Sequence, residues 1–179
     1  MTQQIIMAGF GGQGILLAGQ ILAYAGLDEG KNVSWLPSYG PEMRGGTANC
    51  SVVVSDEDIG APCFSEADCV IAMNRPSLDK YESFVKPGGL LIVNSSLIDI
   101  PAKRDDIEVV YIEANRIAED LGTVKAANMV VLGAYIEKTG TVKAETAIKC
   151  LAKKMGEKKA KLIPMNEKAM QAGAEAARG

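Results

Sequence analysis

The sequence contains no histidine, and this absence removes several kinds of site. Serine and cysteine nucleophiles are usually activated by a histidine base, and zinc and Rieske centres usually need histidine ligands. The cysteines offer no replacement, because they lie far apart and form no C-x-x-C motif: Cys50, Cys63, Cys69 and Cys150. We therefore expect this chain alone to bind no metal and no cofactor. Cys50, Cys69 and Cys150 are predicted to be buried thiols, and Cys63 lies in a loop.

An excess of positive charge is also missing. The formal net charge is -3 and the isoelectric point is about 5.1, so the summed field does not attract nucleic acid. The longest apolar stretch, residues 15–27, is shorter than the roughly 20 residues that span a bilayer. The N-terminus lacks the basic and apolar regions of a signal peptide. We expect no nucleic-acid or membrane partner and a cytoplasmic location.

The most distinctive segment of the sequence is rich in glycine. Gly9, Gly11 and Gly14 have the spacing G-x-G-x-x-G between a short apolar run and a long apolar helix pattern. In a strand-loop-helix unit such glycines permit a tight turn, close approach of a phosphate, and packing of helix on strand. The start of the helix offers N–H groups to an anion. The alternative is that the glycines merely let the helix pack closely on the sheet.

The expected second strand, residues 32–36, tests the dinucleotide interpretation. Nicotinamide-binding units place an acidic residue about 20 residues after the glycine loop, and this chain has none there. Residues 38–46 follow instead, and their prolines and glycines predict a structured loop. Tyr39, Glu42 and Arg44 in this loop are suited to recognition of a ligand or partner. The alternative is a surface loop in which Glu42 and Arg44 pair with each other.

The rest of the chain predicts an α/β fold. Residues 47–55 alternate apolar and polar, and no helix separates them from residues 32–36, so this strand should run antiparallel to a neighbour. Residues 86–89 are expected to form a turn. The final third is expected to be helical, and residues 169–179 should fray unless something docks on them. The prediction is one domain, 1–179: a three-layer α/β/α, Rossmann-like domain with a mixed, mostly parallel sheet and a helical C-terminal third.

Two motifs carry a family resemblance. Residues 9–14, GFGGQG, and residues 38–46, SYGPEMRGG, resemble the gamma subunit of 2-oxoacid:ferredoxin oxidoreductases. They also resemble the corresponding domain of single-chain pyruvate:ferredoxin enzymes. Residues 127–133 are similar to a third block of this family. The motif variants look closer to the 2-oxoglutarate or general 2-oxoacid type than to the pyruvate type, and an indolepyruvate enzyme and a free-standing dinucleotide-binding oxidoreductase remain alternatives.

The resemblance implies a role inside a larger enzyme. Such enzymes convert a 2-oxoacid and coenzyme A (CoA) to an acyl-CoA and carbon dioxide, and they reduce ferredoxin. Thiamine diphosphate and iron–sulfur clusters are held by other chains, so the implied partners are alpha, beta and ferredoxin-like delta subunits. An isolated chain is expected to be inactive, and its apolar first helix makes a homodimer plausible.

The residues expected at the coenzyme rim come from the two glycine-containing loops and from one strand end. No catalytic residue is expected in this chain. Asn74 follows a predicted buried strand, where helix capping is an equally good interpretation. The cofactor-binding candidates are Gly9, Gly11, Gly12, Gln13, Gly14, Ser38, Tyr39, Gly40, Glu42, Arg44, Gly45, Gly46 and Asn74.

Overall fold

The computed structural model describes residues 1–38 and 47–179. Within these ranges the chain forms a six-stranded sheet with the order β2-β3-β1-β4-β5-β6. The strands are β1 (Thr2–Phe10), β2 (Asn32–Ser38), β3 (Thr47–Ser55), β4 (Ala67–Ala72), β5 (Val85–Asn94) and β6 (Glu108–Ile112). β1, β4, β5 and β6 are mutually parallel, whereas β3 runs antiparallel to both β1 and β2. The sheet is therefore mixed and mostly parallel, as predicted.

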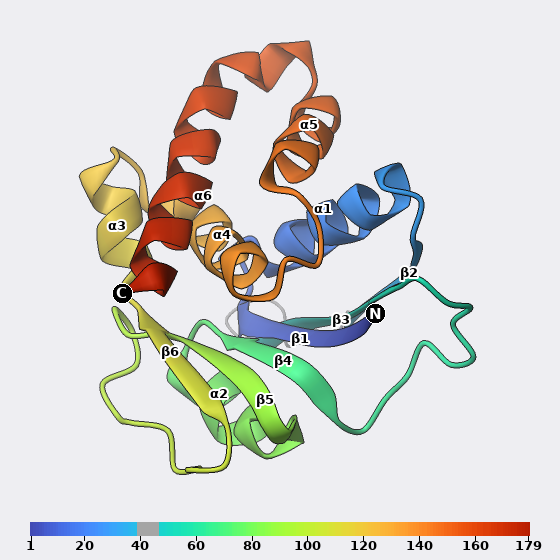
Figure 1. Ribbon diagram of the computed structural model, residues 1–179. Helices are drawn as coiled ribbons and strands as arrows, with labels where there is room; N and C mark the ends of the chain where they lie inside the picture. The colour runs from blue at the N-terminus through green and yellow to red at the C-terminus, as the bar shows by residue number, and fades with distance from the viewer. Residues whose placement is uncertain (39–46) are drawn as a thin grey trace.

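Strand β1 lies near the middle of the sheet and is covered on both faces. Ile5 and Met7 point into a large core on one face, and Ile6 and Ala8 point into a smaller core on the other. This explains why the strand reads as a continuous apolar run, since a central parallel strand has two buried faces. Figure 1 shows the resulting layers, with most helices on one side of the sheet and α2 (Arg75–Tyr81) on the other.

Helix α1 (Ile15–Asp28) packs closely on β2 and β3 because glycines face the strands. A Cβ added at Gly19 would lie 2.5 Å from Sγ of Cys50, and one at Gly26 would lie 2.7 Å from Cγ1 of Val33. Eight residues of α1 are buried, but Tyr24 and Leu27 on its other side are 41% and 55% exposed. The helix is thus less fully buried than its apolar sequence predicts.

The C-terminal third is helical, as predicted. Its elements are α3 (Ala114–Asp120), η3 (Val124–Ala126), α4 (Ala127–Thr139), α5 (Ala144–Met155), η4 (Glu157–Leu162) and α6 (Ile163–Arg178). In α4 every residue from Ala127 to Ile136 is buried. Helix α6 packs against α4 and also contacts β6, and Figure 1 shows its C-terminal end beside that strand.

Two glycines allow α4 and α6 to pack this closely. A Cβ at Gly133 would overlap the carbonyl oxygen of Met170, and a Cβ at Gly173 would overlap that of Val130. The two backbones therefore meet without an intervening side chain. Residues 169–179 do not fray, because they dock on α4, which is the exception that the sequence prediction allowed: Ala169, Met170 and Ala177 are buried. Pro164 lies in the first turn of α6, where proline is well tolerated.

Residues 86–89 are also not the predicted turn. They belong to β5, which begins at Val85, directly after the 3₁₀ helix η2 (Glu82–Phe84). Pairing with β4 shifts register between Ala67 and Cys69, next to this segment. Proline and glycine inside a strand are typical of such irregularities. Pro87, Gly88 and Gly89 therefore mark a local distortion of β5 and not a turn between two elements.

The glycine-loop cleft: a candidate anion-binding site

The loop after β1 borders a cleft at the carboxyl-terminal edge of the parallel strands. The cleft has a volume of about 380 Å³, and residues from the glycine loop, the end of β4, α3 and η3 line it. They are Phe10, Gly11, Gly12, Gln13, Met73, Asn115, Val124, Lys125 and Ala127. Ligands of open α/β sheets bind at this edge. The fold therefore places the predicted glycine motif where a ligand site is expected.

The glycine loop is closed by Gln13. Its Oε1 accepts a hydrogen bond of 2.6 Å from the N–H of Phe10, and its own N–H donates to the carbonyl of Phe10 at 3.2 Å. Gly12 and Gly14 have φ values of 94° and 74°, which are unfavourable for residues with a side chain. Gln13 lines the cleft, but Oε1 is engaged within the loop. Its main observed role is to fix the loop conformation.

Two further contacts hold the loop against the protein. A Cβ at Gly9 would lie 2.5 Å from Oε1 of Gln13 and 2.9 Å from Cβ of Met73, so a side chain there would disturb the turn. Asn128, in the first turn of α4, donates from Nδ2 to the carbonyl of Gly14 at 3.1 Å. The loop is thereby joined to α4, more than a hundred residues later in the chain.

The first turn of α1 presents free N–H groups beside this loop. The first helical hydrogen bond runs from Ala18 to the carbonyl of Gly14, and no side chain among residues 1–38 and 47–179 caps the helix. The N–H groups of the first turn consequently have no acceptor within the helix, and the helix dipole adds partial positive charge. Lys125 supplies a full positive charge across the cleft from the glycine loop that precedes α1. This combination suits an anion such as a phosphate.

A buried asparagine fixes the far wall of the cleft. Asn94, at the end of β5, has no exposed surface, and its Nδ2 donates to the carbonyl of Met73 at 3.2 Å and to Oδ1 of Asn115 at 2.8 Å. Its Oδ1 accepts from the N–H of Ala114 at 3.1 Å. Asn94 therefore ties β4 and α3 together, and it orients Asn115 at the cleft surface.

The other predicted rim residues lie in different surroundings. Asn74 is buried and caps α2, with Oδ1 accepting from the N–H of Ser77 at 3.0 Å, so the capping interpretation is confirmed. It is not among the residues that line the cleft. Ser38 ends β2 opposite Asn49, which in turn lies opposite Ala8, so Ser38 is at the same edge of the sheet. Tyr39, Gly40, Glu42, Arg44, Gly45 and Gly46 lie outside the described residues.

The thiols are placed as the sequence predicts. Cys50, Cys69 and Cys150 are buried and Cys63 is exposed. Burial raises the pKa of Cys50 to about 12, although its contact with Trp35 opposes the shift, and burial also raises the pKa of Cys69. The described part of the chain holds no group of three or more potential metal-ligating side chains. Within the same residues no helix is long and apolar enough to cross a membrane.

Sequence reasoning named Gly11, Gly12 and Gln13 but missed six residues that line the cleft: Phe10, Met73, Asn115, Val124, Lys125 and Ala127. Asn115, Val124 and Lys125 lie on α3 and η3, and no glycine or strand pattern marks them. Lys125 lies two residues before the block at residues 127–133, which was the one available signal.

Comparison with known proteins agrees with this architecture. Residues 4–176 match the family model described as pyruvate ferredoxin/flavodoxin oxidoreductase. Ketoisovalerate oxidoreductase subunit VorA of Methanothermobacter marburgensis is 38% identical over 175 residues, which cover 98% of this chain and 36% of VorA. The chain therefore spans little more than a third of the length of this relative.

Two other relatives are close to this chain in length. The 2-oxoglutarate synthase subunit KorC of the same organism is 41% identical over 159 residues, covering 83% of this chain and 86% of KorC. The crystal structure of a keto/oxoacid ferredoxin oxidoreductase gamma subunit from Geobacter sulfurreducens has a TM-score of 0.85 and 34% identity, with 98% of both chains covered. The chain belongs to the pyruvate ferredoxin/flavodoxin oxidoreductase family.

Proposed function

We propose that residues 1–179 act as one gamma-type domain of a 2-oxoacid:ferredoxin oxidoreductase in the cytoplasm. The complex would convert a 2-oxoacid, CoA and oxidised ferredoxin to an acyl-CoA, carbon dioxide and reduced ferredoxin. The similarity to KorC and to the Geobacter gamma subunit supports this proposal, because both are close to this chain in length. Alpha, beta and ferredoxin-like delta subunits would be its partners.

The observation that carries the proposal is the cationic character of the glycine-loop cleft. The backbone of Gly11 and Gly12, in the loop that leads into α1, and the ammonium group of Lys125 border one cavity of about 380 Å³. CoA carries phosphate groups, and these residues suit a phosphate. We therefore assign the phosphate-bearing part of CoA to this cleft. Tyr39, Glu42 and Arg44 stay predicted contacts of the same rim.

The cleft lining also limits what this chain contributes. Among the described residues, Lys125 is the one lining side chain that ionises, and the other lining residues supply glycine backbone, amide groups and apolar surface. In this proposal the chain binds and orients CoA. Thiamine diphosphate would supply the decarboxylation chemistry and iron–sulfur clusters the electron transfer, both from partner chains.

The test uses Lys125→Gln in the complex reconstituted with its partner subunits. A charge-assisted hydrogen bond contributes about 1.5–3 kcal/mol, so the KM for CoA should rise roughly tenfold or more while kcat changes less. Lys103→Gln is the matched control, because Lys103 is also exposed but lies in the loop before β6, away from the cleft. An unchanged KM for CoA in Lys125→Gln would remove the cleft from CoA binding.

Sheet topology argues against a free-standing dinucleotide-binding enzyme. In that fold the second strand lies beside the first, so that its terminal acid reaches the ribose. Here β3 separates β2 from β1, and β2 carries no acid. Titration of the isolated chain with NAD should show no tight binding, whereas micromolar binding would favour the dehydrogenase. Acyl-CoA formation measured with 2-oxoglutarate, ketoisovalerate and indolepyruvate would separate the remaining substrate types.

A further inference from the structure

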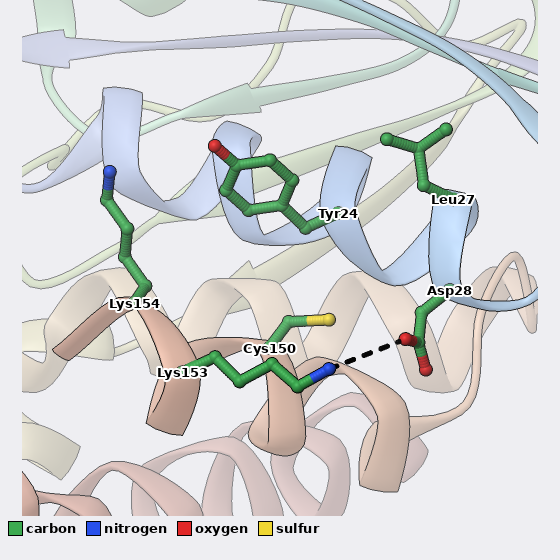
Figure 2. A pocket seen from close by; sticks show the side chains of 6 residues that line it. All are labelled: Tyr24, Leu27, Asp28, Cys150, Lys153 and Lys154. Carbon is green, nitrogen blue, oxygen red and sulfur yellow. Dashed lines mark ion pairs between the residues drawn. The ribbon is translucent and has the colours of Figure 1, made fainter. Parts of the chain in front are cut away.

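A second cleft lies between α1 and α5, on the helical side of the sheet. Its volume is about 510 Å³, and it is lined by Tyr24, Leu27, Asp28, Cys150, Lys153 and Lys154. Figure 2 shows the Tyr24 ring on α1 above Cys150 of α5, with Lys153 extending toward Asp28. None of these residues lines the glycine-loop cleft. The surface is therefore separate from the proposed CoA site.

One side of this cleft is apolar and exposed. Tyr24 and Leu27 lie almost one helical turn apart on α1 and are 41% and 55% exposed. Exposed apolar side chains that gather beside a cavity are typical of protein interfaces, whereas single ones are common on any surface.

The other side is strongly basic. Residues 149–161 contain six lysines and a single acid, Glu157, in a chain whose net charge is -3. Asp28 binds two of the lysines, at 3.2 Å from Nζ of Lys149 and 3.8 Å from Nζ of Lys153. The remaining lysines, Lys154, Lys158, Lys159 and Lys161, form no ion pair with any carboxylate in the described residues. No residue of η4 is buried, so this positive charge faces solvent.

We propose that the α1–α5 cleft docks an acidic segment of a partner subunit of the same complex, with one or two apolar side chains inserted beside Tyr24 and Leu27. This inference rests on the proposed function, because it needs a multisubunit enzyme. Charge complementarity selects the occupant: the unpaired lysines attract carboxylates, and the apolar side needs apolar side chains. A nucleic acid is disfavoured as the occupant, because the cleft offers it one aromatic ring to stack on among the described lining residues.

The experiment measures binding between the purified chain and the partner subunits purified as a subcomplex. Lys153→Glu/Lys154→Glu reverses two charges, and Leu27→Ser removes an exposed apolar group. The double charge reversal should weaken binding at least tenfold and flatten its salt dependence, and Leu27→Ser should weaken it about fivefold. Lys103→Glu, on the opposite side of the sheet, should bind within twofold of the wild type. Thermal melting confirms that each variant is folded.

The outcomes separate this inference from the proposed function. If the wild type binds its partners and the complex forms acyl-CoA, but both cleft variants bind as well as the wild type, the docking site is wrong and the proposed function stands. Absence of acyl-CoA formation by the wild-type complex refutes the function itself. If sedimentation shows that the wild type is a dimer and the cleft variants are monomers, while partner binding is unaffected, the surface binds a second copy of this chain and the proposal is wrong. If the wild type binds a fluorescent polyuridine and the charge-reversal variant does not, the surface binds nucleic acid and the proposal is likewise wrong.

Discussion

Asn128 is hydrogen-bonded to the carbonyl of Gly14, and it also occupies the space that a side chain at position 14 would need. The Nδ2–O distance is 3.1 Å, and a Cβ at Gly14 would overlap Nδ2. Gly14 in addition has φ of 74°, which a residue with a side chain adopts only with strain. The loop that begins α1 and the first turn of α4 therefore fit each other in a single arrangement.

Gly14→Ala should reduce the free energy of unfolding by about 3 kcal/mol, because backbone strain and steric overlap add. Gly30→Ala is the matched control: its φ is 80°, but a Cβ there meets no atom within 4 Å, so it should cost only about 1 kcal/mol. Urea denaturation measures both. In an Asn128→Ala background the cost of Gly14→Ala should fall toward that of Gly30→Ala. Equal costs in both backgrounds would show that the contact with Asn128 does not restrict position 14.

Gly173→Ala should destabilise the protein even though alanine is the better helix former. In an exposed helix this change typically stabilises by about 0.5–1 kcal/mol, but here the new methyl group overlaps the carbonyl of Val130 on α4. Overpacking of this kind costs about 1–3 kcal/mol. Gln171→Ala, at an exposed position of the same helix, should be nearly neutral. Faster amide exchange in α6 of the Gly173 variant would locate the damage, and a rise in stability would contradict the close contact.

The end of α6 is attached by an ion pair that should respond to acid. Arg178 donates to Glu137 at 2.8 and 3.0 Å, and this hydrogen bonding and the arginine charge lower the pKa of Glu137. A lowered folded-state pKa contributes stability above the unfolded-state pKa, and that stability is lost as the pH falls through the folded-state value. Arg178→Gln should therefore lower Tm at neutral pH more than at strongly acidic pH. A constant difference in Tm across this range would contradict the assigned shift.

The cysteines should react with iodoacetamide in the order of their exposure. Cys63 is exposed and should be alkylated first, whereas Cys50 is buried with a pKa of about 12 and carries almost no thiolate at neutral pH. Cys69 is fully buried and should react, like Cys50, only after unfolding. Mass spectrometry after timed quenching measures the sites. Rapid labelling of Cys50 in the folded protein would show that α1 separates from the sheet.

Local sequence patterns predicted the parts of the fold that have local causes. The alternation in residues 47–55 and the lack of an intervening helix predicted an antiparallel β3, and the structure confirms it. Residues 169–179 were expected to fray unless something docked on them, and the sequence did not identify α4 as the element that does. Their order comes from the contact of Gly173 with α4, which small residues permit but which no local pattern reveals.

The candidate site could be predicted only in part. The glycine spacing marked one wall, because a tight turn demands particular residues. Asn115 and Lys125 come from the opposite wall, where neither backbone geometry nor periodicity restricts the sequence. Gln13 was identified as a ligand contact, but its Oε1 is turned toward the N–H of Phe10. Sequence spacing could not show this, since an amide side chain serves a loop or a ligand equally well.

The antiparallel strand β3 has a consequence for how members of this fold can diverge. The parallel strands β1, β4, β5 and β6 form a continuous unit, and the β2–β3 hairpin is added at one edge of it. The strand ends that flank the hairpin connection, Ser38 and Thr47, lie at the same edge as the glycine loop, with Thr47 opposite Phe10. Changes of sequence in the β2–β3 hairpin thus leave the pairing of β1, β4, β5 and β6 with one another untouched.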